Sequence, residues 1–143
     1  MKKKSCTKRI IAIATAIIIT IASIFVYINI KPVSVDYGMS ELYTQQDMDS
    51  AIELIKESID SRKGCKLYSL SYAGDGWSSK ELDYCNSLER SEELFTECIV
   101  FDSCFRSPIF GGGGWNANSL YYWNWYLART DDGPWQLVSW GYA

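Results

Sequence analysis

The stretch at residues 120–142, LYYWNWYLARTDDGPWQLVSWGY, decides the fold of this chain. It predicts two long strands, 120–129 and 135–141, because aromatic residues favour strands and bury large areas. The sequence between them, Asp131-Asp132-Gly133-Pro134, is strong turn chemistry. The rest of the folded chain is expected to cover one face of this aromatic hairpin.

A helix and two further strands are expected upstream of the hairpin. Thr44 and Asp47 have the spacing of a capping box. Apolar residues then recur at helical spacing and predict an amphipathic helix over 45–62: Met48, Ala51, Ile52, Ile55 and Ile59. Residues 65–72 and 98–105 read as strands, whereas 77–96 fits either a short helix or an irregular edge. The predicted class is α+β, with the helix across the concave face of a curved antiparallel sheet.

The N-terminus predicts a membrane anchor. Five basic residues within residues 1–9 precede an uncharged run over 10–30, and about 20 apolar residues are enough to cross a bilayer. A cleaved secretory signal is the alternative, but its apolar core spans only ~7–15 residues. We therefore expect a cytoplasmic tail and signal-anchor in residues 1–30, a tether in 31–40 and a domain in 41–143. Basic residues stay in the cytoplasm, which predicts a single-pass cell-membrane protein with an extracytoplasmic domain.

Charge limits the partners. After residue 30 the chain has nine basic and seventeen acidic residues, a net charge of −8. An acidic domain repels phosphate backbones, so nucleic acid is not an expected partner. The membrane is the expected partner of the N-terminal helix, and a small molecule, a glycan or a protein that of the domain.

The cysteines predict disulfides and no metal site. Cys65, Cys85, Cys98 and Cys104 all lie in the expected outer domain, where disulfides are permitted. If strands 65–72 and 98–105 pair as antiparallel neighbours, the nested pairing Cys65–Cys104 with Cys85–Cys98 follows; otherwise Cys65–Cys85 is favoured. The chain has no histidine and no Cys-x-x-Cys, so neither a metal nor a cofactor is expected.

The order of helix and strands, with the aromatic pattern of residues 122–129 and 135–142, resembles the nuclear-transport-factor-two-like (cystatin-like) superfamily. More narrowly, it is similar to small membrane-anchored proteins of unknown function from Gram-positive gut bacteria. The resemblance covers roughly residues 41–142 and implies a fold more than an activity. It implies either a binding module or an isomerase, cyclase or dehydratase. The absence of histidine removes the Asp–His pair that such enzymes commonly use.

Candidate site residues come from the aromatic side chains. Most are expected in the core, but Tyr68, Tyr72, Trp123 and Trp125 are candidates for a ligand-binding cavity or platform. The predicted function is a non-catalytic binding or interaction domain, with catalytic residues unknown.

The alternative function is a small-molecule lyase or isomerase that uses an inward Asp102 and a cavity tyrosine. We expect Asp102, Arg106 and Arg129 instead to be exposed charges at strand ends, which contribute little.

Overall fold

The computed structural model describes residues 2–30, 32–88 and 94–142. The chain forms two compact units, Met1–Pro32 and Val33–Ala143. The first is helix α1, Lys2–Ile30, within which Arg9–Tyr27 is long and apolar enough to cross a membrane. The second unit is called the folded domain.

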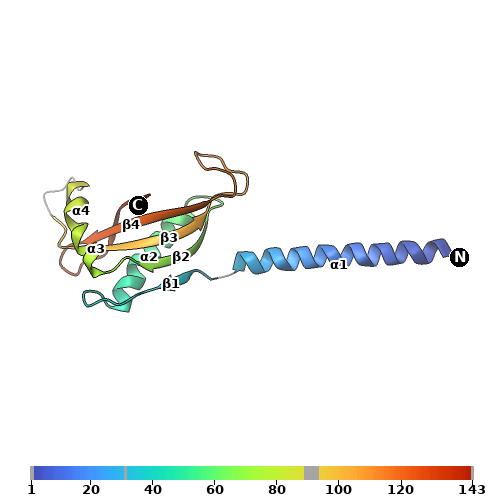
Figure 1. The fold of residues 1–143 in the computed structure, drawn as a ribbon, viewed down its shortest axis with the longest axis horizontal. Helices are drawn as coiled ribbons and strands as arrows, with labels where there is room; N and C mark the ends of the chain where they lie inside the picture. Colours follow the sequence, from blue (N-terminus) through green and yellow to red (C-terminus); the bar gives the residue numbers. More distant parts are fainter. Residues whose placement is uncertain (1, 31, 89–93, 143) are drawn as a thin grey trace. The chain divides into compact units, whose positions relative to one another are not determined.

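The folded domain is built on a five-stranded open sheet in the order β1-β2-β3-β4-β5 (Figure 1). The strands are β1 Ser34–Asp36, β2 Lys66–Tyr72, β3 Glu97–Arg106, β4 Leu120–Arg129 and β5 Gln136–Gly141. The α+β prediction is confirmed. The sheet is mixed, however, because β1 pairs in parallel with β2 while the other neighbours are antiparallel. The strand β1 lies in the stretch that the sequence had suggested as a tether.

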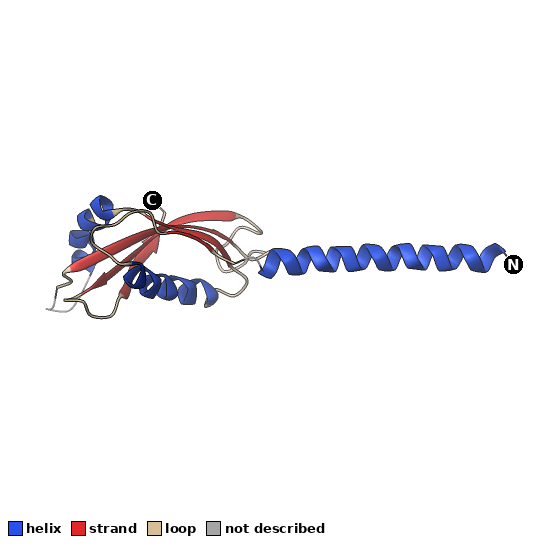
Figure 2. Ribbon diagram, turned by 90° about the horizontal axis from the view of Figure 1, so that it is seen from below, coloured by secondary structure: helices blue, strands red, loops and turns tan. Residues whose placement is uncertain are grey.

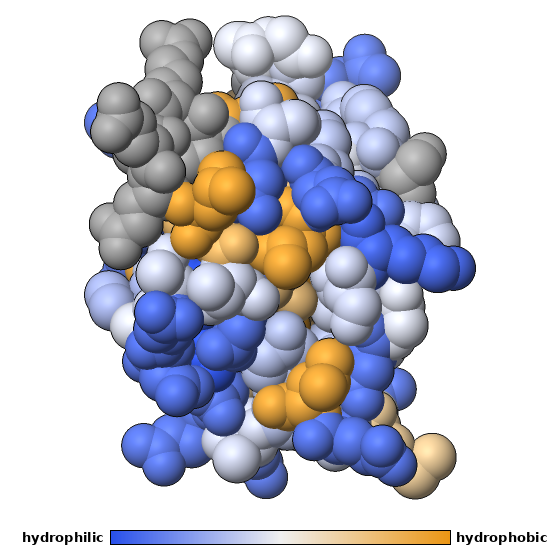
Figure 3. Space-filling view, turned by 90° about the vertical axis from the view of Figure 1, so that its left-hand side faces the viewer, coloured by the Kyte–Doolittle hydropathy of each residue, from blue (hydrophilic) through white to orange (hydrophobic). Residues whose placement is uncertain are grey.

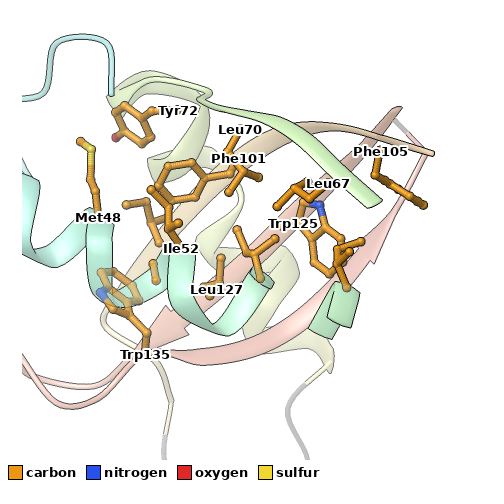
Figure 4. Packing of buried hydrophobic residues seen from close by; sticks show 14 of the residues in the cluster. Met48, Ile52, Leu67, Leu70, Tyr72, Phe101, Phe105, Trp125, Leu127 and Trp135 are labelled. Atoms are coloured by element: carbon orange, nitrogen blue, oxygen red, sulfur yellow. The ribbon is translucent and has the colours of Figure 1, made fainter. Parts of the chain in front are cut away.

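Helix α2, Gln45–Asp60, covers one face of the sheet (Figure 2). Its start is the predicted capping box, with the Thr44 hydroxyl accepting from the Asp47 backbone and the Asp47 carboxylate accepting from the Thr44 backbone. The buried residues of the helix are the predicted apolar set: Met48, Ala51, Ile52, Ile55 and Ile59. They pack against the sheet side chains shown in Figure 4, including Phe101 and Trp125, both 0% exposed. We call this side the α2 face.

Two short helices cover part of the opposite face, which the sequence left ambiguous. They are α3, Asp75–Lys80, and α4, Leu82–Leu88. Residues on β3 alternate between the faces, so Ile99 and Phe101 join the main cluster while Cys98 and Val100 join a second one with Cys85. Sequence reasoning expected one covered face and the structure has two.

The predicted disulfides are absent: Cys65, Cys85, Cys98 and Cys104 are all thiols. The strands do pair as antiparallel neighbours, but Lys66 lies opposite Arg106 and Leu67 opposite Phe105, and after a bulge at Tyr68 the partner of Cys104 is Ser69. At about 3.3 Å per residue, the four residues from Cys65 to Ser69 span ~13 Å, beyond the ~7 Å that a bridge tolerates. Cys65 also packs against the main cluster, whereas Cys85 belongs to the second, so the Cys65–Cys85 alternative fails too.

Cys85 and Cys98 are nevertheless neighbours. Their Sγ atoms lie 3.4 Å apart in the buried second cluster. The hydrogen bond between the two thiols lowers the pKa of Cys85, and the same contact together with burial raises the pKa of Cys98. The predicted closeness of this pair is confirmed, but the predicted disulfide between them is absent.

Candidate functional site at the acidic end

The two ends of the sheet differ in charge. The acidic end comprises the last residues of β2 and β4, the first residues of β3, residues 39–44, the starts of α2 and α3, and the turn at 130–134. Carboxylates gather there: Glu41, Asp47, Asp49, Asp75, Glu97, Asp131 and Asp132. The basic end comprises residues 61–66, the β3–β4 loop 107–119, the residues of β3 and β4 that adjoin this loop, among them Arg106, and Tyr142. Figure 3 looks onto the end of the domain that carries α3 and α4, where hydrophilic side chains surround hydrophobic ones.

The acidic end is organised around Arg129, the last residue of β4, of which only 8% is exposed. Its Nη1 donates to Asp47 Oδ1 at 2.9 Å, and Nη2 donates to Glu97 Oε2 at 2.7 Å. Asp132 Oδ1 lies farther away, 3.5 Å from Nη2. The guanidinium also stacks on the Trp135 ring, 4.3 Å from its centroid. The prediction that Arg129 is an exposed strand-end charge is therefore wrong.

Electrostatics in this cluster favour the charged forms. Burial alone would lower the pKa of Arg129, but hydrogen bonds to Glu97 and Asp47 outweigh it and raise that pKa. The pKa of Asp47 is lowered, first by the hydrogen bond from the Thr44 hydroxyl and then by Arg129. Three carboxylates around one guanidinium leave a net charge of −2. The cluster therefore places one buried, charged arginine among three carboxylates.

Two open hollows flank Arg129, and both are bordered by Asp47 and Asp132. The first, about 370 Å³, is further lined by Leu42, Tyr43, Ser79, Leu82, Thr96, Glu97 and Cys98. The second, about 410 Å³, is further lined by Ser50, Leu54, Gly133, Pro134 and Trp135. We call the two together the Arg129 groove. It combines negative charge with apolar walls.

Hydrogen bonds fix the walls of the Arg129 groove. The Tyr43 hydroxyl donates to the Cys98 carbonyl at 2.9 Å, and burial raises the pKa of Tyr43. Trp135 Nε1 donates to the Asp47 carbonyl at 3.1 Å. The rings of Tyr43 and Trp135 meet edge to face, 5.6 Å apart. The groove is therefore preformed by side chains whose polar atoms are already bonded.

The four aromatic site candidates do not converge on one site. Trp123 and Trp125 are neighbours on the α2 face, with ring centroids 6.0 Å apart. Tyr72 lies in the same cluster but packs at the acidic end, where its hydroxyl donates to Asp75 and burial raises its pKa to about 12. Tyr68 lies beside Arg106, whose guanidinium is 5.5 Å from its ring centroid. Their role in ligand binding stays a prediction.

Asp102 does not point into the α2 face. It shares the opposite face with Val100 and lies across from Asn124 of β4. Its surface is exposed as a whole, although nearby atoms remove enough water from the carboxylate to raise its pKa. Within the described part of the chain, no aspartate or glutamate is buried. The α2 face therefore lacks, among described residues, the buried carboxylate that the lyase or isomerase alternative requires.

Sequence reasoning did not single out the Arg129 groove as a site. Its central contacts join residues far apart in the chain, since Arg129 lies 82 positions after Asp47 and 32 after Glu97. The sequence offered one signal: Arg129 ends a predicted strand, and the turn that follows contains Asp131 and Asp132. Comparisons with protein-family models, curated proteins and solved structures find no significant match to the chain.

Proposed function

We propose that this protein is a membrane-anchored, non-catalytic binding domain that faces outward and holds a basic, partly apolar peptide segment of a protein partner in the Arg129 groove. The observation that carries the proposal is the groove itself: a buried arginine ion-paired to three carboxylates between two open hollows. Open hollows on either side of one cluster suit an extended segment better than a small molecule, which usually needs an enclosing pocket.

The ligand class follows from charge and lining. The net charge of −2 attracts cations, and the outer carboxylate of Asp132, with its side chain 93% exposed, is free to meet solvent. Leu42 and Leu82 supply apolar contacts in one hollow, and Trp135 does so in the other. A lysine or arginine beside a bulky apolar residue would satisfy both features.

The anchor is supported by the chemistry of α1. Its section Arg9–Tyr27 is predominantly apolar, and none of it is buried against other parts of the chain. The hydroxyls of Thr15, Thr20 and Ser23 each donate to the carbonyl four residues earlier, at 2.8–2.9 Å. Hydroxyls bonded in this way leave no unsatisfied donor for lipid. The basic residues in the first turns of the helix, before its apolar section, favour a cytoplasmic N-terminus and an outward domain.

The proposed cystatin-like architecture is supported by α2 packed on the successive antiparallel strands β2 to β5. The same packing favours binding over catalysis, since the space between α2 and the sheet is filled by fully buried side chains such as Ile55 and Trp125. The position of Asp102 on the other face gives no support to a lyase or isomerase.

The test is peptide binding to the full chain in nanodiscs. An array of fluorescein-labelled peptides would vary the number of lysines and leucines, and nuclear magnetic resonance would follow the Arg129 Nε–H and Trp135 indole signals. Peptides that carry both residue types should bind and shift these two signals. Shifts confined to other parts of the domain would contradict the proposal.

Matched substitutions sharpen that test. Asp132→Asn removes an exposed charge but suits the left-handed turn, where φ is 57°. It should weaken peptide binding about two- to fivefold, the usual range for one exposed charge pair. Asp60→Asn removes another exposed carboxylate, at the other end of α2, and should leave binding unchanged.

A further inference from the structure

The β3–β4 loop, residues 107–119, displays two adjacent large apolar side chains. Ile109 is 59% exposed and Phe110 is 95% exposed. Leu120, Tyr122 and Tyr142, which lie on the neighbouring strand β4 and just after β5, are also 48–71% exposed. So many exposed apolar and aromatic side chains at one end of a small domain indicate an interaction surface.

The loop is held in place by its own contacts. Ser107 is buried, and its hydroxyl accepts from the Ser119 backbone at 2.9 Å. Trp115 folds back and packs edge to face on Phe105 and Tyr121, at 5.7 and 4.9 Å. The exposed pair at 109–110 is therefore presented by a structured loop whose other apolar residue, Trp115, is already packed.

The chain enters the folded domain from this same end. Strand β1 runs parallel to β2, with Ser34 opposite Ser69, so residues before Ser34 come from the side where β2 begins. The start of β2 pairs with the end of β3, where Lys66 lies opposite Arg106 and the loop follows. Only residues 31 and 32 separate the end of α1 from the first residue of the folded domain, Val33. The three steps from Ile30 to Val33 span at most ~11 Å.

This basic end carries positively charged side chains, although the folded domain as a whole is acidic. Arg62, Lys63, Lys66 and Arg106 lie here, and no acidic residue occurs in 61–66 or in 103–130. Segments 61–66 and 107–119 are in contact, because a Cβ atom added to Gly64 would lie only 3.2 Å from the Pro108 side chain. Basic side chains beside exposed apolar and aromatic ones are the usual features of a surface that binds anionic lipid.

We infer that the basic end docks on the outer leaflet of the bilayer crossed by α1, with Ile109 and Phe110 inserted at the interface and Lys63, Lys66 and Arg106 near lipid phosphates. The inference rests on the proposed anchoring of α1. It adds an orientation: the basic end faces lipid and the Arg129 groove faces away from it. A short connection to α1 keeps the loop near the bilayer, so weak insertion is enough.

The test uses the full chain in nanodiscs that contain lipids with gadolinium-chelate headgroups. Amide signals of residues 109–114 should lose intensity, while those of Met39 and Leu94 at the acidic end should persist. The loss should be larger with phosphatidylglycerol present than in phosphatidylcholine alone. Intact loop signals in a chain whose α1 signals are broadened would overturn the docking inference alone. A chain that does not enter nanodiscs would overturn the anchoring.

Two double variants provide the control. Ile109→Ser with Phe110→Ser should restore the loop signals, whereas Met39→Ser with Leu94→Ser, which also removes two exposed apolar side chains, should not. Unchanged signals from the core residue Ile52 would confirm that each variant folds. If a second copy of the chain covers the loop instead, its signals should depend on the number of chains per nanodisc and not on gadolinium, which would contradict the inference.

Discussion

The acidic and basic ends of the sheet use the same residue type in opposite ways. At the acidic end Arg129 is buried and ion-paired to carboxylates from α2, β3 and the following turn. At the basic end Arg106 is half-buried, with its Nη1 donating to Asn118 and its guanidinium over the Tyr68 ring. The first arginine joins three elements through ion pairs, whereas the second forms no ion pair among the described residues. The acidic end is therefore expected to contribute to both stability and binding, and the basic end mainly to binding.

The largest effect is expected from the core that joins the two ends. Ile55 is 0% exposed beneath the sheet, and Ile55→Ala should lower the free energy of unfolding by ~2–5 kcal/mol through lost burial and a cavity. Urea unfolding of the full chain in detergent measures it. Glu57→Ala, an exposed site on the same helix, is the control. Equal midpoints for the two variants would show that α2 does not hold the ends together.

Arg129→Met should have the next largest effect. It should lower the free energy of unfolding by about 2–4 kcal/mol, because it leaves partly buried carboxylates without a cation. The matched change at the basic end, Arg106→Met, should cost less than about 1 kcal/mol. Urea titrations of both variants at neutral pH compare the ends directly. A larger loss for Arg106→Met would reverse the proposed difference between them.

The Arg129 effect should also depend on pH. The pKa of Asp47 is lowered in the folded state from 3.8, so its stabilisation is present above that value and is lost as pH falls through the lower folded value. Wild-type protein should therefore lose stability in this acidic range. Arg129→Met should lose less there, because part of the lowering comes from Arg129. Identical dependence of stability on pH in the wild type and in Arg129→Met would show that Arg129 does not contribute to the lowered pKa of Asp47.

A moderate effect is expected at the capping box. Thr44→Ala removes the hydroxyl that bonds Asp47 at 2.6 Å and caps α2, which should reduce stability by ~1 kcal/mol. Thr44→Ser keeps the hydroxyl and should restore most of it. Thermal unfolding followed by circular dichroism distinguishes the two; equal losses would mean that the cap contributes little to the acidic end.

The smallest effect on stability is expected at Phe110. Because this side chain is 95% exposed, Phe110→Ser should change the free energy of unfolding by no more than about 0.5 kcal/mol. The residue would then matter for docking and not for folding. A loss comparable with that of Ile55→Ala, measured in the same detergent, would place Phe110 in the core and remove the contrast between the ends.

Strong local patterns made most of the fold predictable. The helical spacing of Met48 to Ile59 and the aromatic strand of β4 each have a period that tertiary contacts reinforce. Strand β1 could not be recognised, since three residues after a proline carry no periodic signal. The polar composition of α3 and α4 likewise hid the second covered face.

The site was much less predictable. The Arg129 cluster depends on the register that brings Glu97 opposite Arg129 and on the packing that brings α2 beside them. Neither can be deduced from residue spacing in the chain. The register between β2 and β3 likewise separates Cys65 from Cys104, because Leu67 pairs with Phe105 and the partner of Cys104 is Ser69, four residues from Cys65.

Photo-cross-linking in intact cells tests most directly whether the two ends face different partners. Benzoylphenylalanine would replace Phe110 at the basic end, Ser50, an exposed α2 residue that lines the Arg129 groove, or Glu57 farther along the same helix. Lipid adducts are expected from position 110, a protein adduct from position 50 and no dominant adduct from position 57. Lipid adducts from position 50 with protein adducts from position 110 would contradict the proposed orientation.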